Sequence, residues 1–147
     1  MVGPASWSLD HANGFEKMES GFNARAEDFA RFGQLMLQQG QLDGRRVVPA
    51  AWALASTSPQ PEPPGYYARL PWLQAEGRYY GAMWWGQRRA DGGRDFAARG
   101  NHGQMVFVSP ANRVVIVRHG TRYGLPGPQW FERARGMANR LGARARP

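Results

Sequence analysis

The chain of 147 residues, 42% hydrophobic and 12% aromatic, is long and apolar enough for one domain with its own core, which excludes disorder along its whole length. Its net charge is +8, but the cationic side chains, all arginine except Lys17, are scattered from Arg25 to Arg146 without the clustered stripe that nucleic-acid recognition needs, so no nucleic-acid partner is expected. The absence of cysteine excludes disulfides, thiolate metal sites and a cysteine nucleophile, and the sequence shows neither a membrane-length apolar run nor a signal peptide.

Residues 1–21 show no sustained periodicity and are predicted to form an irregular N-terminal segment, because Ser, Asp, Asn and Gly there compete with regular structure. A helix is predicted from Asn23, which can cap it, to Gly40, a residue type that commonly ends helices. Glu27 and Asp28 in its first turn suit the positive end of the helix dipole. Its apolar residues at helical spacing are Phe29, Phe32 and Met36.

The next stretch combines turn signals with prolines. Asp43-Gly44 predicts a tight turn before the apolar pair Val47-Val48. Pro49, favoured at the first position of a helix, predicts a short second helix from there to about Ser56. Residues 58–72 are predicted to form an extended surface loop within the same domain, because prolines remove backbone donors and restrict dihedrals. These prolines are Pro59, Pro61, Pro63, Pro64 and Pro71.

The following region is predicted to contain strands. An aromatic-rich stretch at 79–85, bounded by Gly77 and Gly86, alternates in residue type and predicts one strand. Three further strands are predicted at 96–99, 104–108 and 114–119. The short connections between them, including a turn at 109–112, make neighbouring strands antiparallel.

A C-terminal helix is predicted to begin at Pro128 and to cover the sheet, because its apolar residues fall on one face. Those residues are Trp130, Phe131, Ala134, Met137, Ala138 and Leu141. The tail after Gly142 is expected to fray. Together these elements predict an α+β fold, in which N-terminal helices precede an antiparallel meander sheet that a C-terminal helix covers.

Three runs of sequence resemble a known family. They are SGFNARAEDFARFG at 20–33, LQQGQLDGRRVVP at 37–49, and a strand region that contains YGAMWW, ARGNHGQ and VFVSP within 80–110. Their order resembles the serine hydrolases that include class C β-lactamases, D-alanyl-D-alanine carboxypeptidases, related esterases and, closest in character, aminohexanoate-oligomer hydrolases. The resemblance covers nearly all of residues 1–147 and implies that they form the C-terminal portion of such a domain, with a partial β-lactamase/transpeptidase-like fold.

The family's nucleophile is missing from this chain. In such enzymes a Ser-x-x-Lys pair supplies the acylated serine and its activating lysine, and a Tyr-x-Asn relays protons. Lys17 is the sole lysine and the residue three before it is Gly14, while no tyrosine is followed two places later by asparagine. Both motifs lie N-terminal to the matched region in the family. The resemblance therefore implies a chain that is inactive unless an N-terminal segment is supplied.

A third family element, Lys-Thr-Gly or His-x-Gly, closes the site, and the resemblance places it at His102, Gly103 and Gln104. It implies that His102 is a catalytic wall residue, that Gly103 and Gln104 bind substrate, and that the backbone N–H of Met105 donates to the oxyanion. Gln104 departs from the commoner glycine. The residues themselves leave two interpretations open: Gly100 and Gly103 give room for substrate beside a strand, or they form a bulge or turn.

Other chemically capable side chains are expected to be structural. His11 and His119 show no metal-ligand spacing. The paired Trp84 and Trp85 are expected to be core on one face of a strand and cover on the other. Two serines without a neighbouring base are expected to serve turns or caps, and they are Ser20 and Ser109.

The sequence supports one main function and leaves alternatives. The resemblance implies a fragment of a serine hydrolase that acts on small amide or ester substrates through an acyl-serine, without a metal or other cofactor. A non-catalytic module that binds a peptide or protein through an open strand edge is the alternative. A basic nucleic-acid binder is a third hypothesis that a flat response of binding to salt would exclude. Composition does not separate a cytoplasmic from a periplasmic location.

Overall fold

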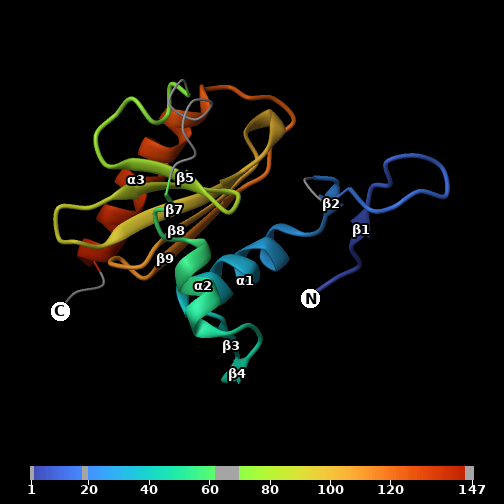
Figure 1. The fold of residues 1–147 in the computed structure, drawn as a ribbon, viewed down its shortest axis with the longest axis horizontal. Coiled ribbons are helices and arrows are strands. Elements are labelled where there is room, and N and C mark those ends of the chain that lie inside the picture. Colours follow the sequence, from blue (N-terminus) through green and yellow to red (C-terminus); the bar gives the residue numbers. More distant parts are fainter. Residues whose placement is uncertain (1, 18–19, 62–69, 145–147) are drawn as a thin grey trace.

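A computed structural model describes residues 2–17, 20–61 and 70–144 and contains a five-stranded antiparallel sheet with helices on both faces (Figure 1). The sheet follows the chain as a meander in the order β5-β6-β7-β8-β9, and the small pairs β1–β2 and β3–β4 precede it. This arrangement confirms the predicted α+β fold. In chain order the elements are β1 (Ser6–Trp7), β2 (Phe22–Asn23), α1 (Ala26–Leu37), β3 (Gln41–Leu42), β4 (Arg45–Arg46), α2 (Ala50–Ser56), β5 (Arg78–Gly81), β6 (Trp84–Arg88), β7 (Arg94–Arg99), β8 (Met105–Ser109), β9 (Val114–Arg118) and α3 (Gly127–Arg144).

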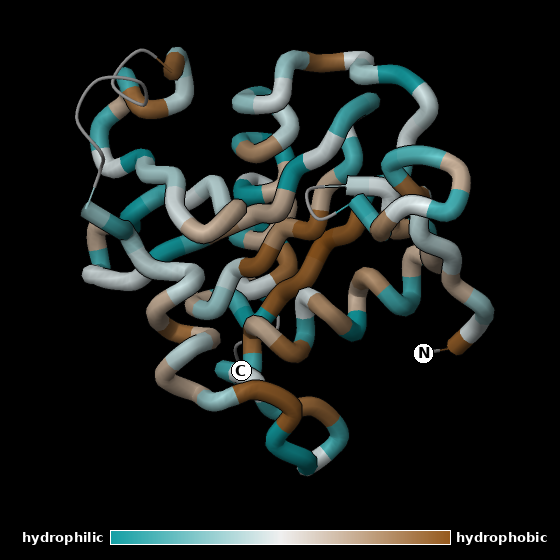
Figure 2. Tube along the Cα trace, turned by 45° about the vertical axis from the view of Figure 1, so that its right-hand side comes forward, coloured by the Kyte–Doolittle hydropathy of each residue, from teal (hydrophilic) through white to brown (hydrophobic). Residues whose placement is uncertain are grey.

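Alternating side chains on the central strands build one core on each face of the sheet. Phe96 and Val108 face α1 and α2, whereas Ala97 and Phe107 face α3. Phe96 and Phe107 are at most 1% exposed, and burying a side chain of this size contributes roughly 1.5–3 kcal/mol. Figure 2 shows the hydrophobic segments of the chain running through the centre of the molecule. The two cores fix the position of the sheet and therefore of the residues at its ends.

The aromatic stretch at 79–85 forms a hairpin, so the prediction of a single strand was wrong. β5 and β6 pair with each other, and Ala82 and Met83 between them have φ of 46° and 70°. Two consecutive left-handed residues are what a tight hairpin turn requires. Neither residue is the Asn, Asp or Gly that is usual in such a turn, so residue types did not predict it. By contrast, Asp43-Gly44, with φ of 50° and 75°, forms the predicted turn between β3 and β4.

Helix α1 begins later than predicted and ends at Leu37, with Gln38 rather than Gly40 as its C-cap. Asn23 does not cap the helix, because it lies in β2 and its side-chain amide donates to the Gly21 carbonyl at 2.9 Å. The residue before the helix is Arg25, which makes no side-chain capping hydrogen bond. At the other end Gly40, with φ of 86°, donates its N–H to the Leu35 carbonyl at 2.7 Å and closes the turn after the helix.

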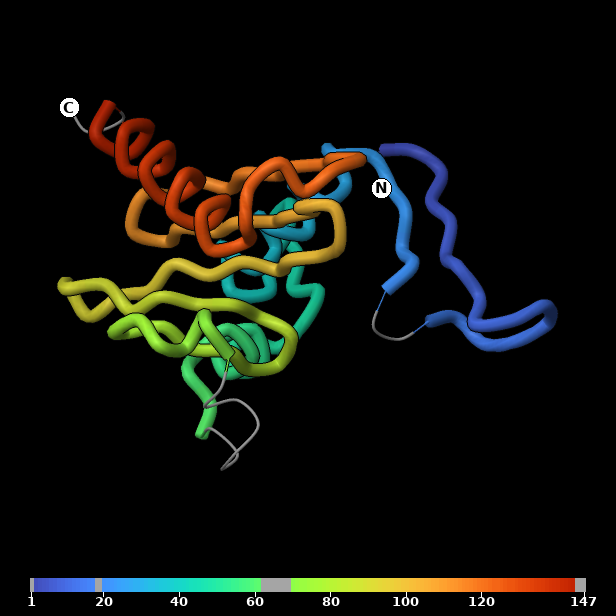
Figure 3. Tube along the Cα trace, turned by 90° about the horizontal axis from the view of Figure 1, so that it is seen from above, coloured from blue at the N-terminus to red at the C-terminus, as the bar shows by residue number. Residues whose placement is uncertain are grey.

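The N-terminal residues form an arm that extends away from the sheet (Figure 3). The arm folds back on itself, since β1 pairs with β2 and Leu9 bridges Glu16, so it is more regular than the irregular segment predicted. Its apolar side chains are largely exposed, with Phe15 at 82% and Trp7 at 48%. Trp7 contacts Phe22 edge-on at 5.2 Å, which holds the two short strands together.

The predicted surface loop at 58–72 holds only in part. Residues 62–69 lie outside the described residues. Trp72 is 2% exposed, and its indole N–H donates to the Tyr79 carbonyl at 2.9 Å while the ring packs edge-on against Trp85 and Phe131. The prediction was wrong at Trp72 because the large apolar indole closes the core between α3 and the first strands of the sheet.

The remaining helices lie close to their predicted positions. α2 begins directly after Pro49, and α3 begins one residue before Pro128. The residues of α3 that are buried against the sheet are Phe131, Ala134, Ala138 and Gly142. Met137 and Leu141, which were predicted to share this face, are 45% and 44% exposed. They lie on a flank of the helix rather than on its buried face.

Candidate functional site

An open cleft of about 1000 Å³ lies where β7 leads into β8. Residues 98–102 and 104–106 form one wall, residues 119–121 after β9 form a second, and residues 20–24 with Phe29 of α1 form a third. Gly103 lines the smaller hollow of about 240 Å³ beside this cleft. Segments far apart in sequence therefore meet at one end of the sheet. A concave site in which apolar surface is joined by a few polar groups is the usual form of a ligand-binding site.

His102 lines this cleft but does not lie in a strand. It is the middle residue of a short 3-10 turn, Asn101–Gly103, and has φ of 57°, a left-handed conformation that histidine adopts more readily than bulky or branched residues. Its ring lies 5.4 Å from the Tyr123 ring. The turn interpretation of residues 100–103 is therefore the one that the backbone adopts, and it presents the exposed His102 imidazole at the cleft.

Gln104 also lines the cleft, and its side chain closes a local structure. Its amide nitrogen donates to the Gly120 carbonyl at 2.6 Å, and its amide oxygen accepts from the Gly120 N–H at 3.1 Å. This paired contact binds the turn before β8 to the segment after β9. A glycine at position 104 would leave the two walls of the cleft unconnected here, which gives the departure from the family pattern a structural role.

The backbone N–H of Met105 lies in the plane of the sheet and points toward β9, away from β7. The Gly100 N–H donates to the Gln104 carbonyl at 2.9 Å, so residues 100 and 104 form a hydrogen-bonded pair of the β7–β8 ladder. Because hydrogen bonding alternates along an antiparallel strand, the Met105 N–H is directed to the other side, toward its register partner Arg118 in β9. Donating to an oxyanion in the cleft would require this group to leave the ladder.

Arg99, the last residue of β7, lies at this end of the sheet. Its Nη1 is buried and has no hydrogen-bond partner among the described residues. The guanidinium stacks on Trp85 at 4.6 Å and lies 5.4 Å from the Trp72 ring. Burial, and secondarily the charge of Arg78, lowers the pKa of Arg99 from its ordinary value. Arg99 lines both the main cleft and a smaller hollow of about 240 Å³ beside it.

Arg118 supports the turn that carries His102. Its guanidinium donates to the carbonyls of His102 and Gly103 at 3.1 and 2.7 Å and lies over the Trp130 ring at 4.1 Å. A side chain at Gly103, whose φ is 78°, would meet this guanidinium at 2.4 Å. Gly103 therefore serves both the left-handed backbone and the close approach of Arg118.

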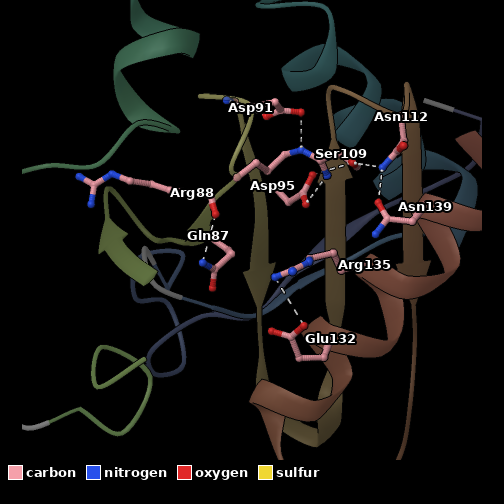
Figure 4. Close-up of polar contacts among 11 residues, drawn as sticks. Gln87, Arg88, Asp91, Asp95, Ser109, Asn112, Glu132, Arg135 and Asn139 are labelled. Atoms are coloured by element: carbon pink, nitrogen blue, oxygen red, sulfur yellow. Dashed lines mark hydrogen bonds and ion pairs between the residues drawn. The ribbon is translucent and has the colours of Figure 1, made fainter. Parts of the chain in front are cut away.

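The opposite end of the sheet holds a polar network centred on the buried Asp95 and Ser109 (Figure 4). Asp95 is fully buried, binds the Arg89 guanidinium at 3.1 Å and accepts from the Ser109 hydroxyl at 2.6 Å. Asn112 donates to Ser109 at 2.9 Å and to Asn139 of α3 at 2.8 Å. The expectation that Ser109 has no neighbouring base was wrong, because the Asp95 carboxylate accepts from its hydroxyl. Because Ser109 is also fully buried, this contact joins strands and helix rather than activating a nucleophile.

The other singled-out residues divide between the cleft and the remaining structure. His119 and Ser20 line the cleft, whereas His11 is exposed on the arm. Trp84 lies in the core beside α1, and Trp85 packs against Trp72 on the other face, as expected of paired tryptophans. Within the described residues no group of three or more His, Cys, Asp or Glu is arranged to hold a metal ion. None of the described helices is long and apolar enough to cross a membrane.

The chain has a partial β-lactamase-like fold, as comparison with a solved structure shows. A similar structure is a Bacillus anthracis protein described as a "putative 6-aminohexanoate-dimer hydrolase", with a TM-score of 0.61 and 24% sequence identity. The similarity covers 82% of this chain and 30% of that protein, so this chain spans less than a third of its length. At this identity the likeness concerns the fold. No protein-family model and no curated protein matches the chain.

Sequence reasoning found the histidine turn but missed the arginines around it. Arg99 was part of the ARGNHGQ run, yet no spacing rule distinguishes it from the other arginines of a strongly basic chain. One signal was present: Arg99 is the last residue of β7 and lies three positions before His102. Polar residues where a strand ends are disproportionately functional, because loops held by a rigid scaffold carry binding groups.

Proposed function

We propose that this chain forms one wall of the active site of a serine hydrolase that cleaves amide or ester bonds, and that the acylated serine comes from a polypeptide segment outside these 147 residues. The observation that carries the proposal is the open cleft at the end of β7 and β8, which brings His102, Gly100 and Gln104 beside a volume of about 1000 Å³. The Ser-x-x-Lys pair that would complete it is absent from the sequence.

In this proposal His102 contacts the substrate from the turn between β7 and β8, while Gly103 and Gln104 shape the adjoining surface. Gly100 has no side chain and leaves space for a planar amide or ester group to approach the backbone, whereas Arg118 occupies the space beside Gly103. Polarisation of the substrate carbonyl would come from a backbone N–H at this wall; Met105 is the predicted donor, and its N–H would have to leave the β8–β9 ladder to reach the carbonyl. Arg99 offers a further cation at the edge of the cleft.

Labelling with a fluorophosphonate that reacts with activated serines tests this proposal. The chain alone should remain unlabelled, because no serine in it has an activating lysine at the required spacing. The polypeptide encoded directly upstream of the Met1 codon, expressed together with this chain, should become labelled. Labelling of the 147-residue chain itself would show that the proposal is wrong. So would the absence of any labelled serine in the combined protein, meaning this chain expressed together with the upstream polypeptide.

A non-catalytic module that binds an extended peptide or protein is the second candidate. The observation in its favour is that β9 is the last strand of the sheet order. This candidate predicts that a peptide binds and that no serine in either polypeptide is labelled. The two measurements together separate the candidates.

A further inference from the structure

The smaller hollow of about 240 Å³, called the α3 hollow below, lies beside the start of α3. Its lining includes Trp85, Met105 and Trp130, which belong to or pack against the core under that helix. The larger cleft is instead lined by Ala98, which packs against the core on the other face of the sheet, and by Phe29 of α1. The two spaces therefore open toward different helices and meet at the turn between β7 and β8.

Arg99 brings an unpaired positive charge to the α3 hollow. Strand alternation places its side chain on the same face of the sheet as Ala97, which is buried under α3. Its Nη1 is buried without a hydrogen-bond partner, and the ion pairs found among the described residues do not include Arg99. A buried donor without an acceptor is costly, and more so when it is charged. The guanidinium therefore keeps hydrogen-bonding capacity for a charged acceptor.

The neighbouring charged side chains already have partners. Arg118 donates to the carbonyls of His102 and Gly103 at 3.1 and 2.7 Å. Arg78 pairs at 2.9 Å with Glu132, the single acidic residue of α3. No acidic side chain among the described residues lines the α3 hollow. A ligand with one negative charge would match the charge that remains, that of Arg99.

The Arg99 guanidinium is held in a fixed position. It stacks on Trp85 at 4.6 Å and lies 5.4 Å from the Trp72 ring. The start of α3 comes so close that a side chain at Gly127 would overlap the guanidinium. A guanidinium fixed in this way loses little conformational freedom when it binds a planar carboxylate through two parallel hydrogen bonds.

The size and lining of the α3 hollow limit the ligand further. Its volume is below the roughly 300–1000 Å³ that is typical of sites for drug-sized molecules, so it suits a ligand of few atoms. Met105 and Trp130 offer apolar surface near Arg99. A short-chain carboxylate would place its charge on the guanidinium and its hydrocarbon part against these side chains.

We propose that the α3 hollow binds a short-chain monocarboxylate through the Arg99 guanidinium. The carboxylate is bound from the α3 side of the sheet, apart from the bond that the proposed hydrolase would cleave. The inference goes beyond the proposed function and does not depend on it, because it needs no segment from outside these 147 residues.

Titration of the purified chain with butyrate and with butyramide, followed by NMR at constant ionic strength, tests the role of charge. The two molecules have nearly the same shape, but only butyrate is charged at neutral pH. Butyrate should bind at least about tenfold more tightly than butyramide. Equal affinity, or no binding of either, would overturn the proposal.

The same titration locates the site. The amide resonances of Gly100, Asn101 and Gly127, which line the α3 hollow, should shift as butyrate binds. Those of Phe22 in the larger cleft and of Gly92 in the turn between β6 and β7 should not. Shifts confined to the cleft would overturn the assignment to the α3 hollow.

Variants test whether Arg99 holds the carboxylate. Arg99→Met should weaken butyrate binding at least about tenfold. Arg133→Met is the matched control and should leave binding unchanged, because Arg133 is an exposed residue of α3 outside the lining and its loss changes the net charge equally. An equal effect of the two variants would overturn the role of Arg99. Should Arg99→Met lose its cooperative thermal transition, Gly127→Ala, which displaces the guanidinium and keeps its charge, should weaken binding in its place.

Inorganic phosphate separates a monocarboxylate site from a general oxyanion site. Phosphate carries more than one negative charge on average at neutral pH and has no hydrocarbon part, so it should bind more weakly than butyrate. Phosphate binding as tight as that of butyrate, on the same amide resonances, would overturn the choice of a monocarboxylate.

Discussion

The two ends of the sheet differ in whether their buried polar groups have hydrogen-bond partners. At the end formed by the β6–β7 and β8–β9 turns, Asp95 is fully buried and its carboxylate binds both Arg89 and Ser109. At the other end, Arg99 has a buried Nη1 without a partner among the described residues, and the His102 turn borders an open cleft. At the Asp95 end the buried polar groups bind one another, whereas at the Arg99 end a buried polar group lacks a partner and a cleft lies beside it.

This difference separates stability from function. Polar groups that satisfy one another connect strands and helix and leave little capacity for a ligand. Polar groups that lack partners beside a cleft cost stability, and such groups are commonly kept for binding or catalysis. Substitutions at the end that holds Asp95 should therefore change the free energy of unfolding most. Substitutions at the open end, which holds Arg99 and the His102 turn, should change it least.

The largest expected effect is at Asp95. Asp95→Ala should lower the free energy of unfolding by about 3 kcal/mol, because it leaves the Ser109 hydroxyl without its acceptor and removes a buried partner of Arg89. Ser109→Ala should cost about 1–2 kcal/mol. Urea denaturation of the purified chain measures both. A loss below about 1 kcal/mol for Asp95→Ala would contradict the assignment of this end as the structural one.

Tyr79 should give the chain an alkaline limit of stability. Its hydroxyl donates to the Thr57 carbonyl at 2.7 Å, and burial raises its pKa above the ordinary value of a tyrosine. Because the folded state binds this proton more tightly than the unfolded state, the stabilisation is complete below about pH 10 and is lost as pH rises further. Tyr79→Phe should cost about 1 kcal/mol at neutral pH through the lost hydrogen bond.

Thermal denaturation of both proteins between pH 8 and pH 11 measures this effect. The difference in stability between the wild type and Tyr79→Phe should narrow as the pH rises beyond about 10. Tyr123→Phe is a suitable control, because Tyr123 is 53% exposed. An unchanged difference across this range would show that the Tyr79 hydroxyl does not resist ionisation in the folded chain.

Arg99 should behave unlike Asp95 although both are charged residues of β7. Arg99→Met replaces a guanidinium that has an unpartnered Nη1 with an apolar chain that can still pack on Trp72 and Trp85. We expect the free energy of unfolding to change by less than about 1 kcal/mol in either direction, because the lost stacking offsets the relieved desolvation. A loss as large as that of Asp95→Ala, measured in urea, would show that the open end is structural too.

The predictable part of the molecule was the part governed by local rules. The strands at β7, β8 and β9, the Asp43-Gly44 turn and the C-terminal helix follow from residue type and periodicity. The hairpin at Ala82 and Met83 did not, because alanine and methionine are uncommon in left-handed turns. The burial of Trp72 depends on contacts with Phe131 far along the chain, which local patterns do not contain.

The candidate site was predictable in position more than in geometry. The run around His102 indicated a turn that the structure places beside the cleft, but the direction of the Met105 N–H depends on the ladder register and could not be predicted from residue types. The same holds for Arg99 and Arg118, whose surroundings are made by Trp85 and Trp130 from other elements. Sequence patterns give the order of elements, while pairing and packing decide which groups meet.

The smallest expected effect on stability is at His102. His102→Asn keeps a residue that tolerates the left-handed φ of 57°, removes the imidazole, and should change the free energy of unfolding by less than about 0.5 kcal/mol, since the side chain is exposed. In the combined protein the same variant should slow phosphonate labelling at least about tenfold if His102 contacts the reacting group. His11→Asn, on the exposed arm, is the matched control and should leave labelling unchanged. Equal labelling rates for the two variants would remove His102 from the site, and the cleft would then have to act through Arg99 or the backbone alone.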